Sequence, residues 1–434
     1  MKSKNYVFRI TVAAVALSAG FFAFGVHAVQ ALDRPLLYSP KDGNLLDQPL
    51  QVVGTAPVNS TIRITVDSKV AANVKIPKPV VKKGKKVPTT ANFSYTYTKT
   101  LGTGTHTVTA QTVQGSVVSE LATRTLTVPA KWRRKVDGEM VATKVWNQLP
   151  FGVMIENTLA ARPQAGLSQA AIVYETLAEG GVTRFLAIYP QATKPKLLGP
   201  VRSSRPYYVD WAKEHDAIYL HAGGSLDAFQ EIGKLKVRSF DGLTRIGAKY
   251  YSRKCYGVHC LFTSTAQLGK LIKEKKLANV VAKSDAGWIF KNDALLKDRP
   301  KSASNKKLSI DFNGRTYRVD WTYDRATNRY KRMNGGVIAK DRNTGKQIRA
   351  ANVLVQRIPK EKVLDRKLRL EFKLIGRGDA TLYRDGKAIA LRWWKKDKNS
   401  KTVFFLKGTQ TVVEFNRGTT WVEVVPGTRS VTYK

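Results

Sequence analysis

Cysteine is almost absent from this chain: Cys255 and Cys260 are the only two among 434 residues. No cysteine lies near the end of the amino-terminal apolar run, which argues against lipid attachment there. In an exported chain, a C-x4-C spacing is typical of a disulfide that closes a small loop, and we predict a Cys255–Cys260 bond. The alternatives are a thiol nucleophile beside His259 or His221, half of a zinc site, or free thiols.

Several signatures of known chemistry are also missing. No G-x-S-x-G pattern surrounds Ser203 or Ser204, and the glycine-rich word HAGGS lacks the Gly-Lys-Ser/Thr ending of a phosphate-binding loop. Nothing matches a helix-turn-helix or an RNA-binding motif. We therefore predict no cofactor, no metal site and no specific nucleic-acid partner.

Acidic residues are few: 32 Asp and Glu face 74 Lys and Arg, which gives a formal net charge of +42. Such an excess draws a chain to polyanions. An exported chain first meets anionic lipids and wall polymers, so we predict an anionic cell-envelope polymer or the membrane surface as partner. The sequence specifies no oligomeric state. The basic segment 75–90 contains six lysines, and it is either a solvated surface loop or a binding site for such a polymer.

Only one long apolar run is present. Ile10–Val26 follows a positively charged start, and Val26-His27-Ala28 fits the small-x-small cleavage pattern. Residues 1–31 are thus predicted to be a signal peptide or, because about 17 apolar residues reach the short limit for a span, an uncleaved anchor. Either case places the rest of the chain outside the cytoplasm, secreted or membrane-anchored.

The remaining pattern predicts an α+β protein with an N-terminal β-sandwich, a central mixed α/β domain and a C-terminal β-rich domain. Residues 33–129 are short alternating runs and resemble bacterial immunoglobulin-like modules. A basic linker covers 130–149. The central domain, 150–303, alternates short apolar runs with amphipathic stretches, and 304–434 returns to strands, with turns at Asn313-Gly314 and Asp385-Gly386.

Polar residues in the central domain collect where strands give way to loops, the usual place for functional groups on mixed sheets. Imidazoles are predicted to move protons and arginines to clamp a carboxylate or phosphate. The catalytic candidates are His221, His259 and Glu179, and the ligand-binding candidates are Glu156, Glu175, Arg184, Arg202, Ser203 and Arg205. The plain alternative is a scaffold role, because Glu and Arg at strand ends often form buried ion pairs.

Several rare words carry a family resemblance: ENTLAARPQAGLSQAAIVYETLAEGG, LLGPVRSSRPYYVDWAKEHDAIYLHAGGS, YDRATNRYKRMNGG and GTTWVEVVP. In this order they resemble the bacterial YerB-like family, with DUF3048 N- and C-terminal domains. The resemblance implies an exported two-domain α+β core, with the immunoglobulin-like module outside it. The resemblance does not imply any particular enzymatic reaction. The family's word at the cysteine loop is closer to Pro-His-Asn, which argues against shared thiol chemistry.

Two functions remain open. The first is an exported envelope protein that binds an anionic wall glycan, peptide or polymer through an Arg/His/Glu pocket. The alternative is a wall-acting hydrolase or transferase that uses His221, His259 and Glu179. Both require side chains far apart in the sequence to converge on one open pocket.

Overall fold

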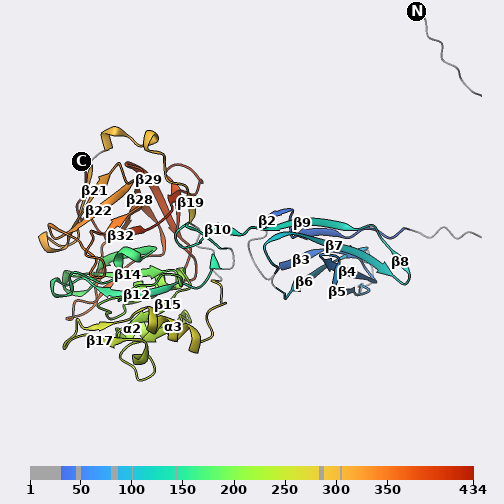
Figure 1. The fold of residues 1–434 in the computed structure, drawn as a ribbon, viewed down its shortest axis with the longest axis horizontal. Coiled ribbons are helices and arrows are strands. Elements are labelled where there is room, and N and C mark those ends of the chain that lie inside the picture. Colours follow the sequence, from blue (N-terminus) through green and yellow to red (C-terminus); the bar gives the residue numbers. More distant parts are fainter. Residues whose placement is uncertain are drawn as a thin grey trace, which may run out of the picture. The chain divides into compact units, whose positions relative to one another are not determined.

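The computed structural model describes residues 31–44, 50–79, 87–99, 101–142, 145–282, 288–303 and 305–434. The predicted signal peptide or anchor lies outside them apart from Ala31, and so do residues 80–86 of the basic segment. The chain forms two compact units, Met1–Pro129 and Ala130–Lys434 (Figure 1). In the described ranges, no helix is long and apolar enough to cross a membrane.

The first unit is built from two sheets around one core that includes Val52, Ile64 and Val108. Side chains of Ser60–Val66 alternate between buried and half-buried, as expected for strands with one face on a core. One sheet has the order β1 (Leu36–Ser39), β3 (Leu50–Pro57), β6 (Thr90–Tyr97). The other has the order β2 (Gly43–Asn44), β9 (Ala122–Val128), β7 (Gly104–Gln114), β4 (Ser60–Val66), β5 (Lys69–Ile76), with β8 (Val117–Val118) on β7. The immunoglobulin-like assignment remains a prediction.

A ten-stranded sheet forms the centre of the second unit. Its order is β16 (Ser239–Asp241), β15 (Ile218–His221), β12 (Phe151–Glu156), β14 (Thr183–Tyr189), β13 (Ile172–Leu177), β32 (Thr420–Pro426), β25 (Asn352–Ile358), β28 (Gly376–Arg384), β29 (Lys387–Lys395), β30 (Val403–Leu406). The sheet therefore takes strands from both sides of the predicted boundary at residue 303. Its inner strands β12, β13, β14 and β32 are buried along their whole length because both faces are covered.

Different elements cover the two faces. On one face, Val153 and Phe185 pack with Trp321 and Tyr330 of a second sheet. That sheet has the order β23 (Val337–Ile338), β22 (Arg329–Asn334), β21 (Arg318–Asp324), β20 (Lys307–Asp311), β33 (Val431–Tyr433), with β24 (Arg349–Ala350) on β22. On the other face, Met154 and Leu186 pack with Tyr208 and Trp211 of α1.

The described residues contain three short α-helices: α1 (Pro206–Glu214), α2 (Leu226–Lys234) and α3 (Thr265–Glu274). Pro206 occupies the first turn of α1, and the Ser225 hydroxyl accepts a hydrogen bond from the Ala228 amide at the start of α2. Two-stranded ribbons complete the unit: β10 (Lys131–Arg133) with β11 (Met140–Ala142), β17 (Ser252–Arg253) with β18 (Leu261–Phe262), β19 (Ile289–Lys291) with β31 (Glu414–Asn416), and β26 (Lys362–Val363) with β27 (Leu370–Glu371).

The predicted fold class, α+β with a central mixed α/β domain, is wrong: the protein is mostly β. The central residues contribute only short helices, and their strands do not close a sheet of their own. β13 pairs in parallel with β32, whose residues come from the far end of the chain. Local periodicity identifies strands but not the partner of each strand, so it does not reveal that residues 150–303 and 304–434 contribute to one sheet.

One buried charge cluster holds that junction together. The register of β13 and β32 places Glu175 beside Glu423, and both side chains are 0 % exposed. Arg332 of β22 reaches them from the second sheet, with Nη2 at 2.7 Å from Glu175 Oε2 and Nη1 at 3.7 Å from Glu423 Oε1. Its guanidinium carbon lies 4.4 Å from the ring centre of Trp421, which adds a cation–π contact.

The surroundings of Glu423 change its acidity. Burial and the nearby charge of Glu175 raise the pKa of Glu423 well above its ordinary value. This shift favours the protonated form of Glu423, whose Oε1 accepts a hydrogen bond from Trp321 Nε1 at 2.8 Å. With Glu423 protonated, the Arg332 guanidinium faces a single carboxylate and the buried cluster is close to neutral.

We predict that Arg332→Met destabilises the protein by about 3–5 kcal/mol, because it leaves Glu175 buried without a counter-ion. Glu423→Gln is expected to cost less than about 1 kcal/mol, because a neutral amide replaces a neutral acid. Urea unfolding at pH 7 measures both, with the exposed Arg377→Ala as control. Equal losses for the two core variants would contradict this charge assignment.

Candidate functional site

Glu156, His259 and Arg202 form a cluster at the end of β12. Nδ1 of His259 lies 2.5 Å from Oε2 of Glu156, and Nε of Arg202 lies 3.1 Å from its Oε1. The Glu156 side chain is only 2 % exposed, whereas the His259 and Arg202 side chains are 33 % and 28 % exposed. A buried carboxylate thus orients one imidazole and one guanidinium, both of which reach solvent.

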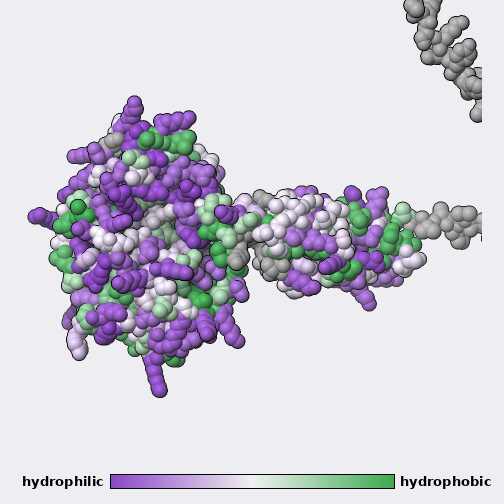
Figure 2. Space-filling view, in the orientation of Figure 1, coloured by the Kyte–Doolittle hydropathy of each residue, from purple (hydrophilic) through white to green (hydrophobic). Residues whose placement is uncertain are grey.

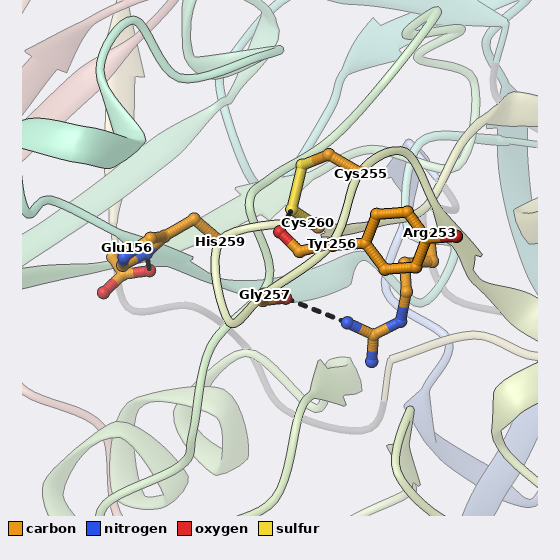
Figure 3. Close-up of a disulfide and its surroundings, with 7 residues drawn as sticks. All are labelled: Glu156, Arg253, Cys255, Tyr256, Gly257, His259 and Cys260. Atoms are coloured by element: carbon orange, nitrogen blue, oxygen red, sulfur yellow. Dashed lines mark hydrogen bonds and ion pairs between the residues drawn. A yellow bond between two sulfur atoms is a disulfide. The ribbon is translucent and has the colours of Figure 1, made fainter.

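A short disulfide loop positions the imidazole. Cys255 and Cys260 are bonded in the structure, and β17 and β18 pair on either side of them. Figure 3 shows His259 turned toward Glu156, while Arg253 donates from Nη1 to the carbonyl oxygen of Gly257 at 2.9 Å. Because the ends of the loop are joined, His259 is held on Glu156 by the backbone as well as by its own hydrogen bond.

A second cluster contains Glu179, Arg184 and Arg205. Arg184 Nη2 lies 3.0 Å from Glu179 Oε1, and Arg205 Nε lies 3.0 Å from Glu179 Oε2. Arg205 Nη2 also contacts Glu179 Oε1. Burial by itself would raise the pKa of Glu179, but the two guanidinium charges outweigh it and lower the pKa to about 2. Glu179 is therefore an anion at neutral pH and only a weak base.

The two clusters are neighbours. Glu156 of β12 and Arg184 of β14 are cross-strand register partners. Arg184 donates from Nη1 to the Ser203 carbonyl oxygen at 2.9 Å, so the segment from Arg202 to Arg205 serves both clusters. Together they hold three guanidinium groups and two carboxylates. This end of the sheet therefore has a positive balance even with His259 neutral.

His221 and Glu175 do not take part. The His221 residue is 0 % exposed, and its ring nitrogens lie 2.8 Å from the Gly223 carbonyl oxygen and 2.6 Å from Ser239 Oγ. Burial lowers its pKa, so it stays neutral. Glu175 belongs to the Arg332 cluster. The structure thus gathers Glu156, Glu179, Arg184, Arg202, Ser203, Arg205 and His259, and leaves these two predicted residues in the core.

The sequence reasoning missed Arg332 and Glu423. Arg332 lies in the sequence YKRMN, directly after Lys331, where a basic residue is expected at the surface. In β22, every second side chain is buried, and Arg332 occupies one of these buried positions. No local sequence motif reveals which face of the strand is buried. A sequence signal for Glu423 does exist. It is the one charged residue in the mostly apolar strand TWVEVVP, and a charged residue in a buried strand usually has a partner.

These features define a class: a mostly β protein whose central sheet is shared by two chain segments and ends in an arginine-rich polar cluster. Two family models match the chain, "Protein of unknown function (DUF3048) N-terminal domain" over residues 137–278 and "Protein of unknown function (DUF3048) C-terminal domain" over residues 308–422.

A protein of Bacillus subtilis (strain 168) named "Putative lipoprotein YerB" is 30% identical over 297 residues, which cover 68% of this chain and 87% of the relative. The crystal structure of the YerB protein from Bacillus subtilis matches with a TM-score of 0.59 and 28% identity, over 69% of this chain and 98% of that chain. The chain belongs to the DUF3048 family, and the resemblance predicted from its sequence words is confirmed.

We predict that Glu179→Gln removes an acid-sensitive part of the stability. The folded pKa of about 2 is below the ordinary 4.5, so the stabilisation is present above pH 4.5 and is lost as the pH falls toward 2. After discounting for partial exposure, we expect roughly 2 kcal/mol at pH 7. The difference between wild type and Glu179→Gln, measured by urea unfolding, is expected to shrink from pH 7 to pH 3. Glu371→Gln, at an exposed position, is the control; a difference that stays constant with pH would refute the assignment.

Proposed function

We propose that this protein works in the cell envelope, outside the cytoplasm, and binds an anionic envelope ligand at the cluster of Arg202, Glu156 and His259. Its support is the excess of guanidinium over carboxylate groups at a place where Arg202 and His259 reach solvent. Arginine suits phosphate and carboxylate because its planar fork forms two parallel hydrogen bonds. Arg184 and Arg205 are held by Glu179 and supply background charge rather than direct contacts.

The envelope location has two supports. One is the predicted signal peptide or anchor over residues 1–31, and the other is the word "lipoprotein" in the name of the Bacillus subtilis relative. The net charge of +42 favours anionic wall polymers and lipid surfaces in general. Figure 2 shows hydrophilic side chains over most of the visible face of the larger unit, in keeping with a surface of this kind.

Binding at a specific site can be distinguished from attraction by the net charge by comparing two arginine variants. We predict that Arg202→Ala weakens binding to a glycerol phosphate wall polymer by at least about fivefold, the loss expected for one charge-assisted contact. Arg377→Ala removes the same charge from an exposed strand position and is expected to change affinity by less than about twofold. Fluorescence-detected titration at 150 mM salt measures both. Equal losses would show that only the net charge matters.

A second function rests on one observation, the bond between His259 and Glu156. With Nδ1 held by a buried carboxylate, Nε2 is the nitrogen left for proton transfer to a substrate. The originally expected trio of His221, His259 and Glu179 is not assembled, and Glu156 takes the place of the carboxylate. This arrangement would suit a wall-acting hydrolase or transferase.

If the second function holds, purified protein incubated with wall fragments yields new products by mass spectrometry, and His259→Gln lowers their yield at least 100-fold. His106→Gln is the matched control, because His106 also bonds a carboxylate, Asp67, at 2.8 Å but lies in the first unit. Absence of products from the wild type, or full yield from His259→Gln, would refute the enzymatic function. Ligand binding would then be the only proposed function left.

A further inference from the structure

A cavity of about 530 Å³ opens on the face of the second unit formed by α1, α2 and the segment 364–375. Its size suits a small molecule or a single extended side chain. Tyr207 and Phe372 form part of its wall, with ring centres 4.5 Å apart, and Leu374 adds apolar surface. The polar cluster proposed above lies on other residues, so this cavity is a separate site.

Asp210 of α1 lines the cavity and is 6 % exposed. Its Oδ1 is buried and has no hydrogen-bond partner among the described residues. A buried carboxylate without a partner costs free energy and normally acquires a counter-ion or a proton. Burial raises the pKa of Asp210 to about 7, with Lys398 opposing and Glu231 adding to the shift. The carboxyl group is therefore poised between its two charge states at neutral pH.

The two lysines that act most strongly on Asp210 are already engaged with other carboxyl groups. Lys398 Nζ lies 2.7 Å from Oε1 of Glu231, and Lys395 Nζ contacts Oε1 of Glu214 and the Ser400 carbonyl oxygen. Asp210 takes part in neither ion pair.

The charge balance of the cavity is unusual for this chain. Its lining has four acidic residues against three lysines, in a protein whose net charge is +42. A net acidic cavity with aromatic walls matches the requirements of an organic cation, because an ammonium group bonds to carboxylate and is attracted to ring faces.

We propose that this cavity binds a primary ammonium group, with Asp210 as its counter-ion and Tyr207 and Phe372 against its alkyl chain. The same group occurs on free diamines and on amino side chains of envelope peptides. The cavity volume admits either one. The inference is independent of the proposed anion-binding function, since the two use different residues and ligands of opposite charge.

Isothermal titration of the full chain at pH 8 tests the proposal with two probes, 1,5-diaminopentane and a short peptide with one lysine. Each is paired with its N-acetylated form, which lacks the charge. We expect saturable binding of at least one amine and none of the acetylated forms. Binding of the diamine identifies a free amine as sufficient, and binding of the peptide alone assigns the site to a peptide-borne amine.

Asp210→Asn is expected to weaken amine binding at least tenfold, the loss of one charged hydrogen bond. Asp298→Asn, at an exposed position outside the cavity lining, is the matched control and should change affinity less than about twofold. Because Asn is isosteric and uncharged, the variant should fold, which circular dichroism checks. Phe372→Leu, which keeps the charge, is expected to weaken binding several-fold.

The pH profile gives a second readout. Asp210 must lose its proton to pair with ammonium, so wild-type affinity is expected to rise about tenfold from pH 6 to pH 8 around the pKa of about 7. Glu214, Glu231, Lys395 and Lys398 are the charged groups that act on the same carboxyl group. Absence of binding by either amine, equal binding of acetylated probes, or wild-type affinity in Asp210→Asn would overturn the proposal.

Discussion

The second unit depends on the contact between β13 and β32. These strands come from opposite ends of the unit, and their parallel pairing places Glu175 and Glu423 side by side in a dry interior. Two adjacent carboxyl groups are stable there only if one is protonated and the other is paired. Arg332 supplies the pairing from a third segment of the chain. The cluster therefore forms only when all three segments are in place, so this part of the sheet is expected to form cooperatively.

That constraint also fixes the polar end of the sheet. Once β13 is anchored to β32, its neighbour β14 sets the position of Arg184, and β12 sets that of Glu156. Glu179 then falls within reach of two arginines and becomes part of the framework. Glu156 lies at the sheet end, where a disulfide loop brings His259 to it. Among the three arginines, exposure separates Arg202, which is proposed to meet a ligand, from the more buried Arg184 and Arg205, which Glu179 holds.

The two proposed sites have opposite charge preferences, and the same physical rule creates both. Where guanidinium groups outnumber carboxylates, as around Arg202, the surplus charge favours anions. Where carboxylates outnumber the lysines, as around Asp210, it favours cations. Although the net charge is +42, salt screens exposed charges that lie more than about 10 Å apart, so the charges nearest to each site dominate there.

The sequence by itself determined the family, the positions of most central strands, the Ser225 cap and the hairpin at Asp385-Gly386, where both turn residues have positive φ. Each of these depends on a few adjacent residues, whose propensities act locally. Tertiary structure alone decided that two segments share one sheet, that His221 is buried and that His259 meets Glu156. Those outcomes depend on strand pairing between distant residues, and pairing is chosen by the burial of the whole unit rather than by any local pattern.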